Sequence, residues 1–338
     1  MSQENLVTLT KKDFESDQEV RWCAGCGDYA ILSAVQKALA STGLPRENHV
    51  FVSGIGCSSR FPYYMNTYGF HTIHGRAPAI ATGLKISRPE LTVWLVTGDG
   101  DALSIGGNHF IHLLRRNVNV NILLFNNRIY GLTKGQYSPT SDRGTVTKST
   151  PMGTLDEPLD PISLALAAKA SFVARTSAVD VKHLTSMLLE AVEHRGASVI
   201  EILQNCPVFN DGVFDDFTGR KTKATHQLEL KPNEPLIFGE NGGKGIGLSG
   251  LSPQILEQEM DGMLENVAIH DPKSRVMAHI LSQLDYPRFP VPMGIFFQET
   301  REVYEDALHA QIDAAKIKKG ASSDLRKLLH GSDSWKLS

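Results

Sequence analysis

The sequence predicts an α/β protein built on a doubly wound parallel sheet. Short apolar runs alternate with longer segments of helical periodicity along the first two-thirds of the chain. The runs are apolar throughout rather than at every second residue, which is typical of strands that are covered on both faces. We therefore expect helices on both sides of the sheet, and ligand binding at the edge formed by the carboxyl ends of the strands.

Four segments are expected to be strands, and each ends at a glycine-rich or polar turn. They cover residues 49–53, 91–96, 120–125 and 198–203. Five helices are expected around them, at residues 28–41, 77–86, 103–116, 160–169 and 181–194. Asp160 followed by Pro161 is a typical helix start, because aspartate caps the free N–H groups and proline fits the first helical position.

The alternation of strands and helices stops near residue 231. Residues 131–157 are irregular and rich in Thr, Ser, Gly and Pro, which inside a compact domain indicates a functional or mobile loop. We divide the chain into a ligand-binding domain at 1–230 and a C-terminal extension at 231–338. The extension shows helix-like segments at 252–265, 273–284 and 302–319 and a proline-punctuated stretch at 286–292. We expect this extension to make subunit contacts.

Composition excludes several classes of protein. The chain has 338 residues, with 34 Lys and Arg against 37 Asp and Glu, so bulk positive charge does not hold it to nucleic acid. Four cysteines are too few for a disulfide scaffold. The first 20 residues lack the apolar core of a signal peptide, and no apolar run approaches the length of a membrane span. We expect a soluble protein of a reducing, cytoplasmic compartment.

Two polar turns follow neighbouring strands and predict a magnesium–diphosphate site. Gly98-Asp99-Gly100 ends one buried strand, and Asn126-Asn127 ends the next. The carboxyl ends of parallel strands meet at one edge, so Asp99 and Asn127 can converge there as hard oxygen ligands for Mg²⁺. The glycines allow a phosphate to approach the backbone and the following helix start. Gly-Asp-Gly alone is more often an ordinary turn, but the paired asparagines favour the site.

Two glycine-rich stretches are discounted as nucleotide sites. Residues 245–250 fit GxGxxG, but they follow a Gly/Pro-rich loop and no long helix clearly follows them. Residues 242–244 lack the spacing and hydroxyl residue of a phosphate-binding P-loop.

The cysteines leave several interpretations open. Cys23 and Cys26 form a CxxC pair, while Cys57 and Cys206 stand alone just past predicted strand ends. A CxxC pair fits zinc, a redox dithiol, an iron–sulfur cluster or chance. A four-cysteine zinc site usually has a second close pair, and a redox dithiol would follow a strand. One [4Fe–4S] cluster near the diphosphate site is favoured; four unrelated buried thiols are the alternative.

These residues together resemble the β subunit of 2-oxoacid:ferredoxin oxidoreductases. The motifs that carry the resemblance are WCAGCG at 22–27, GIGCSSR at 54–60, IHGRA at 73–77, GDGD at 98–101 and YGLTKGQ at 130–136. GDG followed by NN also resembles the thiamine diphosphate motif. PVPMGIF at 290–296 is similar to the 2-oxoglutarate branch of the family. The resemblance covers nearly the whole chain.

The resemblance implies an enzyme with three cofactors: thiamine diphosphate, Mg²⁺ and one [4Fe–4S] cluster. The implied reaction is the coenzyme A-dependent oxidative decarboxylation of 2-oxoglutarate to succinyl-CoA and CO₂, which is reversible in the family. Electrons pass singly through the cluster to ferredoxin. The implied partners are an α subunit in an (αβ)₂ assembly, ferredoxin and coenzyme A, with no nucleic acid and no membrane.

The resemblance also assigns individual residues. The implied cluster ligands are Cys23, Cys26, Cys57 and Cys206, and the implied Mg²⁺ ligands are Asp99, Asn127 and the backbone of Ile129. The implied cofactor contacts are Gly56, Cys57, Ser58, Ser59, His74, Gly98, Asp99, Gly100, Asp101, Asn127, Tyr130, Gly131, Leu132 and Thr133. His74 is also a candidate catalytic residue, with a structural histidine as the alternative.

Substrate choice is predicted to depend on Lys134, with Leu132 beside it. Pyruvate-type relatives tend to have glycine at the position of Lys134, and an ammonium group there would pair with the distal carboxylate of 2-oxoglutarate. The alternatives are a solvent-pointing lysine and the same reaction on pyruvate or branched 2-oxoacids. An alternative of another class is a non-catalytic iron–sulfur or zinc binding module.

Overall fold

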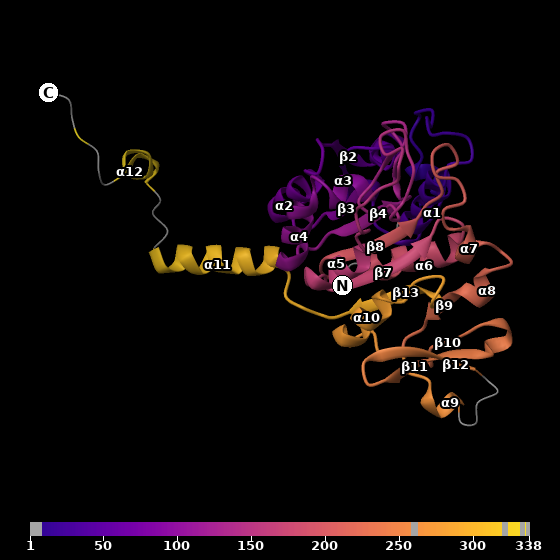
Figure 1. Cartoon of the computed structure of the whole chain (residues 1–338). Coiled ribbons are helices and arrows are strands. Elements are labelled where there is room, and N and C mark those ends of the chain that lie inside the picture. Colours follow the sequence, from indigo (N-terminus) through magenta and orange to yellow (C-terminus); the bar gives the residue numbers. More distant parts are fainter. Residues whose placement is uncertain (1–8, 258–262, 320–323, 332–334, 336–338) are drawn as a thin grey trace.

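The computed structural model describes residues 9–257, 263–319, 324–331 and 335, and it is built on an eight-stranded sheet (Figure 1). In sheet order the strands are β2 (Tyr68–His71), β1 (His49–Ser53), β3 (Thr92–Gly98), β4 (Asn121–Asn126), β8 (Ser198–Leu203), β7 (Phe172–Ser177), β13 (Val291–Gln298) and β9 (Gln227–Leu230). Neighbouring strands are parallel except β13, which runs antiparallel to β7. The α/β prediction is confirmed, and the sheet is mostly rather than wholly parallel.

Helices cover both faces of this sheet. One face carries α1 (Asp28–Ser41) and α6 (Val181–Glu193); the other carries α2 (Ala77–Ser87), α4 (Gly107–Arg116), α5 (Pro161–Ala167) and α10 (Arg275–Ser282). Successive residues of β3 alternate between the two cores, since Val93 and Leu95 pack on one face while Trp94 and Val96 pack on the other. Burial on both faces is the reason why these strands are apolar at every position.

The expected elements of the first 203 residues mostly match the structure. The structure confirms all four predicted strands, and it also confirms the helices predicted at 28–41, 77–86, 160–169 and 181–194. The observed ends differ from the predicted ends by no more than about two residues. The helix expected at 103–116 is wrong in its first turn, because the chain forms α3 (Asp99–Leu103), turns at residues 104–106 and restarts as α4. Strands β2 and β7 were not predicted.

The segment that follows residue 230 contributes to the main sheet. β13 pairs with β7 and β9, and its Phe296 and Phe297 are buried in the core. A small antiparallel sheet precedes it, made of β10 (Ile237–Phe238), β11 (Lys244–Ser249) and β12 (Ser252–Glu257), and α9 (Met263–Asn266) follows β12. The extension therefore shares the core of the large sheet rather than only lying against it.

The predictions for this segment have mixed outcomes. The helix expected at 252–265 is wrong over β12, which pairs as a hairpin with β11; residues 258–262 lie outside the described part of the chain. The GxGxxG stretch forms β11 and its turn, so it opens no helix. The other two helices are confirmed as α10 and α11 (Tyr304–Lys319). Figure 1 shows α11 extending away from the sheet, with α12 (Leu325–His330) beyond it.

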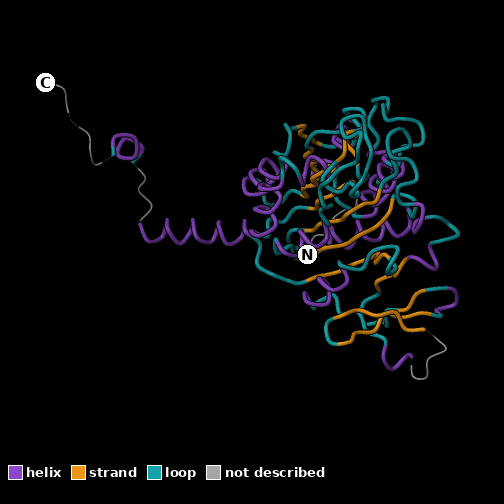
Figure 2. The backbone as a smooth tube through the Cα atoms, in the orientation of Figure 1, coloured by secondary structure: helices purple, strands orange, loops and turns teal. Residues whose placement is uncertain are grey.

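Short elements and loops complete the structure. The remaining ones are β5 (Ile129–Tyr130), β6 (Gln136–Tyr137), α7 (Asp215–Thr218), α8 (Lys223–His226), η1 (Lys11–Phe14), η2 (Arg46–Asn48), η3 (Ser58–Tyr64) and η4 (Glu240–Gly242). Figure 2 shows long loops gathered at one end of the main sheet. None of the described helices is long and apolar enough to cross a membrane.

A buried histidine makes this fold sensitive to acid. His194 follows α6, is 7% exposed, and places its Nε2 atom 2.8 Å from Ser171 Oγ. Ser171 Oγ in turn donates to Asn117 Oδ1 at 2.6 Å. Burial lowers the pKa of His194 to about 4. The folded protein therefore binds this proton more weakly than the unfolded chain, whose histidine pKa is about 6.5.

We predict that part of the stability is lost as the pH falls from about 6.5 towards 4, because His194 must then be charged inside the core. Replacing it by His194→Gln keeps a donor for Ser171 and removes the titration. Between neutral pH and about pH 5, the free energy of unfolding should fall by about 1 kcal/mol less in His194→Gln than in the wild type. Denaturant unfolding measures this difference. An exposed control, His330→Gln, should follow the wild type, and equal pH dependence in all three proteins would refute the assignment.

Candidate active site

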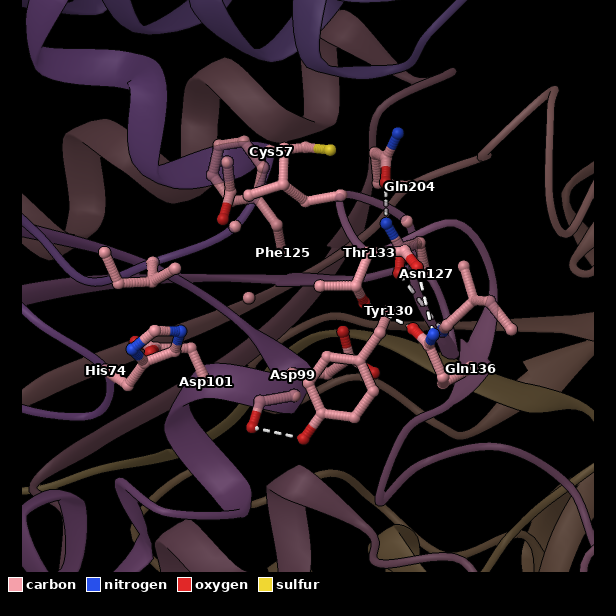
Figure 3. A pocket seen from close by; sticks show the side chains of 18 of the residues that line it. Cys57, His74, Asp99, Asp101, Phe125, Asn127, Tyr130, Thr133, Gln136 and Gln204 are labelled. Atoms are coloured by element: carbon pink, nitrogen blue, oxygen red, sulfur yellow. Dashed lines mark hydrogen bonds between the residues drawn. The ribbon is translucent and has the colours of Figure 1, made fainter. Parts of the chain in front are cut away.

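A cavity of about 360 Å³ opens at the carboxyl ends of β1, β3, β4 and β8. Its walls come from the turn after β1, the β3–α3 junction, the loop after β4 and Gln204 at the end of β8. Figure 3 shows the side chains of Asp99, Asn127, Tyr130 and Gln204 gathered around it. This is the edge at which a parallel α/β sheet is expected to bind a ligand, and the size suits a cofactor.

Asp99 is the buried acid of this cavity. It begins α3 and is 2% exposed. Ser138 and Thr140 donate their hydroxyl groups to its Oδ2 atom, at 2.5 Å and 2.6 Å. Burial raises the pKa of Asp99, while these two hydrogen bonds oppose that rise. The hydroxyl donors are neutral, so they do not balance the negative charge of the carboxylate. A bound cation would balance it.

Asn126 ends β4 and Asn127 follows it, and their side chains point to opposite sides. Asn127 lines the cavity; its Nδ2 donates to Gln204 Oε1 at 2.9 Å and its Oδ1 accepts from the backbone of Ile129 at 3.2 Å. Asn126 is buried and bonds to Thr140 Oγ1 at 3.0 Å. Asp99 and Asn127 therefore come together as expected, and Thr140 lies between Asp99 and Asn126.

At two positions of the site, a glycine lets another side chain pack directly against the backbone. The Tyr130 hydroxyl donates to the backbone oxygen of Gly100 at 3.0 Å, and a Cβ atom at Gly100 would lie 2.2 Å from the tyrosine ring. A Cβ atom at Gly54 would lie 1.8 Å from Asp101 Oδ2. Asp101 also accepts from the backbone of Gly75 at 2.7 Å, and burial raises its pKa. Asp101 thus ties the turn after β1 to the loop before α2.

The cysteines gather beside the same cavity. A Cβ atom at Gly131 would lie 3.6 Å from Cys206 Sγ and 3.7 Å from Cys57 Sγ, so these thiols flank one backbone position. Cys26 Sγ accepts a hydrogen bond from Gln204 Nε2 at 3.2 Å, and Cys23 is exposed. Cys57 itself lines the cavity.

The thiols are close enough to influence one another's ionisation. Burial raises the pKa of Cys57 to about 11 and also raises that of Cys26; the negative charges of Asp28 and of neighbouring cysteines add to both effects. Bound iron would reverse this preference, because a metal favours the thiolate. Within the described part of the chain, no three cysteine, histidine or acidic residues are placed to share one metal ion.

A buried ion pair lies behind the site. Arg175 Nε contacts Glu201 Oε2 at 2.6 Å, with side-chain exposures of 8% and 2%. Burial works against the charge of Arg175, yet the carboxylates of Glu201 and Asp160 raise its pKa. Glu201 Oε1 accepts from Asn126 Nδ2 at 2.7 Å. Hydrogen bonds therefore connect Arg175 through Glu201 to Asn126. The Thr140 hydroxyl lies within hydrogen-bond distance of both Asn126 Oδ1 and Asp99 Oδ2, and its single proton can be donated to only one of them at a time.

Most of the residues expected at the site line the cavity. Those that do are Gly56, Cys57, Ser58, His74, Gly98, Asp99, Gly100, Asp101, Asn127, Ile129, Tyr130, Gly131, Leu132 and Thr133. Ser59 is fully buried and lies away from the lining. Lys134 is exposed in the turn between β5 and β6, next to Leu132 and Thr133, with a left-handed φ of 74°. A non-glycine residue in that conformation is strained, and such strain is common at functional sites.

Sequence reasoning missed several contributors. Gln204 ends β8 at the same edge as Asn127, so its position at a strand end was an available signal. Ser138 and Thr140 come from the irregular 131–157 segment, where no periodicity indicates which hydroxyl turns inward. Asn126 and Glu201 lie on neighbouring strands inside the sheet and are hydrogen-bonded to each other, a contact that only the folded structure reveals.

The chain is similar in sequence to known proteins. Residues 54–202 match the family model described as thiamine pyrophosphate enzyme, C-terminal TPP binding domain. The chain is 55% identical to the 2-oxoglutarate oxidoreductase subunit KorB of Mycobacterium tuberculosis, over 96% of this chain and 87% of that relative. It is 50% identical to the 2-oxoacid:ferredoxin oxidoreductase 1 subunit beta of Aeropyrum pernix, over 56% of this chain and 60% of that relative.

A solved structure is similar over the full length. It is a 2-oxoglutarate:ferredoxin oxidoreductase from Magnetococcus marinus with 2-oxoglutarate, coenzyme A and succinyl-CoA bound. The TM-score is 0.77 and the sequence identity is 31%, with 97% of this chain and 98% of the other covered. The similarity therefore extends past the matched domain into the C-terminal segment.

We predict that Arg175→Met lowers the free energy of unfolding by about 3 to 5 kcal/mol, because Glu201 is left charged and unpaired inside the protein. Arg143→Met is a matched control, since it breaks an exposed ion pair with Glu157 and should cost less than about 1 kcal/mol. Urea unfolding of both variants gives the comparison. Equally small losses in the two variants would show that Arg175 does not neutralise a buried charge.

Proposed function

The chain belongs to the family of 2-oxoacid:ferredoxin oxidoreductase β subunits, and from this premise we propose that it is the β subunit of a 2-oxoglutarate:ferredoxin oxidoreductase. The proposed reaction is the coenzyme A-dependent oxidative decarboxylation of 2-oxoglutarate to succinyl-CoA and CO₂, with electrons passed to ferredoxin. The observation that carries the proposal is the convergence of Asp99, Asn127 and the Gly98–Gly100 backbone on one cavity within the matched thiamine pyrophosphate-binding domain.

Thiamine diphosphate and Mg²⁺ fit this cavity. Asp99, Asn127 and the backbone carbonyl of Ile129 are the proposed Mg²⁺ ligands, and the metal would supply positive charge that favours binding of the diphosphate. When bound, thiamine diphosphate supplies the electron sink that decarboxylation of a 2-oxoacid requires. Ser138 and Thr140 hold the Asp99 carboxylate in place, so the cation site is preorganised before the ligand arrives.

The lining of the cavity has an apolar part and a polar part. The apolar part of the lining consists of Ile55, Ile105, Phe125 and Leu132. Of these, Phe125 is buried, whereas Ile105 and Leu132 are exposed. His74 lies on the exposed side of the same cavity and is the candidate to hold a proton or a hydrogen bond next to the substrate. Tyr130 fixes the Gly100 backbone through its hydroxyl and so keeps the phosphate-binding turn in shape.

One [4Fe–4S] cluster on Cys23, Cys26, Cys57 and Cys206 is part of the proposal. Its support is the approach of Cys57 and Cys206 to Gly131 and the presence of Cys57 in the cavity wall. A cluster held there would lie beside the cofactor, so electrons would have a short path out of the site. A reducing cytoplasm keeps these thiols free for iron, and we place the protein there.

The β subunit acts with another subunit. We propose an α subunit in an (αβ)₂ assembly, with coenzyme A and ferredoxin as further partners and neither nucleic acid nor membrane as a partner. The C-terminal segment is the proposed subunit contact, because several large apolar side chains are exposed beyond the sheet. They include Ile317, Leu325, Leu328, Leu329 and Trp335.

The test uses the purified complex with thiamine diphosphate, Mg²⁺ and coenzyme A, and follows viologen reduction with 2-oxoglutarate, pyruvate or a branched 2-oxoacid. We expect 2-oxoglutarate to give the highest kcat/KM, and Asp99→Asn to abolish reduction and weaken cofactor binding. A preference for pyruvate would instead support the pyruvate branch. A colourless, zinc-containing protein that binds no thiamine diphosphate would eliminate the enzyme and favour a binding module.

Lys134 is the proposed specificity residue. We predict that Lys134→Gly lowers kcat/KM for 2-oxoglutarate about tenfold to a hundredfold, because a charge-assisted contact to the distal carboxylate is lost. Pyruvate has no distal carboxylate, so its kcat/KM should stay within about twofold. Glycine accepts the left-handed φ of 74° without strain, so the turn itself is preserved. An unchanged kcat/KM for 2-oxoglutarate would exclude this role.

A further inference from the structure

Gln204 is a buried side chain that contacts both proposed cofactor sites. It follows β8 directly and is 1% exposed. Its Oε1 atom accepts from Asn127 Nδ2 at 2.9 Å, and its Nε2 atom donates to Cys26 Sγ at 3.2 Å. Figure 3 shows Gln204 directed at Asn127 across the cavity wall. One amide therefore joins a proposed Mg²⁺ ligand to a proposed cluster ligand.

The surroundings hold this amide in one orientation. Its Nε2 atom also donates to the backbone oxygen of Asn205 at 2.6 Å, which fixes the nitrogen on the side of Cys26. The Gln204 backbone nitrogen donates to Asn126 O at 2.9 Å and so ties the residue to β4. Gly27 leaves room for the side chain, because a Cβ atom at Gly27 would lie 2.8 Å from Gln204 Cγ. The orientation is determined by packing and by three hydrogen bonds of the amide.

The contact with Asn127 decides which of its atoms faces a cation. An asparagine amide carries a donor nitrogen at one end and an acceptor oxygen at the other, and only the oxygen can bind Mg²⁺. Because Gln204 offers an acceptor, Asn127 turns its Nδ2 towards Gln204 and keeps Oδ1 on the other side. Asn127 Oδ1 accepts one bond, from Ile129 N, and retains a second lone pair for the metal.

The contact with Cys26 affects the charge at the cluster. A hydrogen bond to a ligating thiolate stabilises negative charge on the sulfur. A reduced iron–sulfur cluster carries one more negative charge than its oxidised form, so such a bond stabilises the reduced form more and raises the reduction potential. The donor belongs to the same amide that orients Asn127.

We propose that Gln204 is a positioning residue that couples the two cofactor sites: its carbonyl orients the Mg²⁺ ligand Asn127, and its amide nitrogen raises the reduction potential of the cluster through Cys26. This inference rests on the proposed function, since it needs both cofactors. It adds a residue that acts on electron flow and on cofactor binding at once. Neither effect requires Gln204 to touch the substrate.

The test compares two substitutions that separate the two halves of the amide. Gln204→Met keeps similar volume and removes all three hydrogen bonds of the amide, including those to Asn127 and Cys26. Gln204→Glu keeps an acceptor for Asn127, removes the amide donor and adds negative charge beside Cys26. The exposed Gln254→Glu makes the same chemical change on β12, outside the cavity lining, and is the matched control.

Two measurements on the purified complex give the readouts: the midpoint potential of the cluster from an EPR-monitored titration at mildly alkaline pH, and the dissociation constant of thiamine diphosphate with Mg²⁺. Gln204→Met should lower the potential and weaken cofactor binding about tenfold. Gln204→Glu should lower the potential by at least 59 mV, the equivalent of a tenfold change for one electron, while cofactor binding stays within about threefold of the wild type. Gln254→Glu should change neither.

An unchanged potential in both Gln204 variants, with iron content equal to that of the wild type, would overturn the coupling while leaving the proposed function intact. If Gln204→Met fails to retain iron, the potential of Gln204→Glu decides the question. A wild-type complex without a cluster or without thiamine diphosphate binding would overturn the proposed function and this inference together. The two failures are therefore distinguishable.

Discussion

The parallel course of β1, β3, β4 and β8 is the constraint on which the site depends. Parallel strands deliver all their carboxyl ends to one edge, so polar residues that are tens of positions apart in sequence converge there. Asp99, Asn127 and Gln204 each follow a different strand and meet around one cavity. Cys57 and Cys206 also follow strand ends, which brings the thiols to the same edge. The sheet thus gathers both proposed cofactor sites in one place.

The interior of the sheet supports that edge with buried polar residues. Glu201 and Arg175 face each other inside the sheet, a location that is costly for charges unless they are paired. Glu201 accepts a hydrogen bond from Asn126, and Thr140 lies between Asn126 and Asp99, within hydrogen-bond distance of both. Asp99 is held by the hydroxyl groups of Ser138 and Thr140, next to these buried polar residues. Catalytic and metal-binding groups benefit from such preorganisation, because no reordering is needed when the ligand binds.

The fold was predictable where the chain obeys a simple period. Strands such as residues 198–203 are buried on both faces and appear as continuous apolar runs, and α1 and α6 show helical spacing. Prediction failed where tertiary pairing overrides the local pattern. Residues 252–257 were expected to be helical and instead pair as a strand with β11. Residues 291–298 lie among prolines, so nothing local indicates that they enter the main sheet between β7 and β9.

The sequence by itself determined the α/β class, the edge at which the site lies and the residue types that a cation, a diphosphate and a cluster require. These follow from strand ends, glycine turns and cysteine spacing, which are local properties of the chain. Only the tertiary structure decided which polar atoms meet. The hydroxyl groups of Ser138 and Thr140 on Asp99, and the amide of Gln204 between Asn127 and Cys26, depend on contacts between distant segments. Hydrogen bonds require correct distance and direction, and side-chain packing in the folded protein sets both.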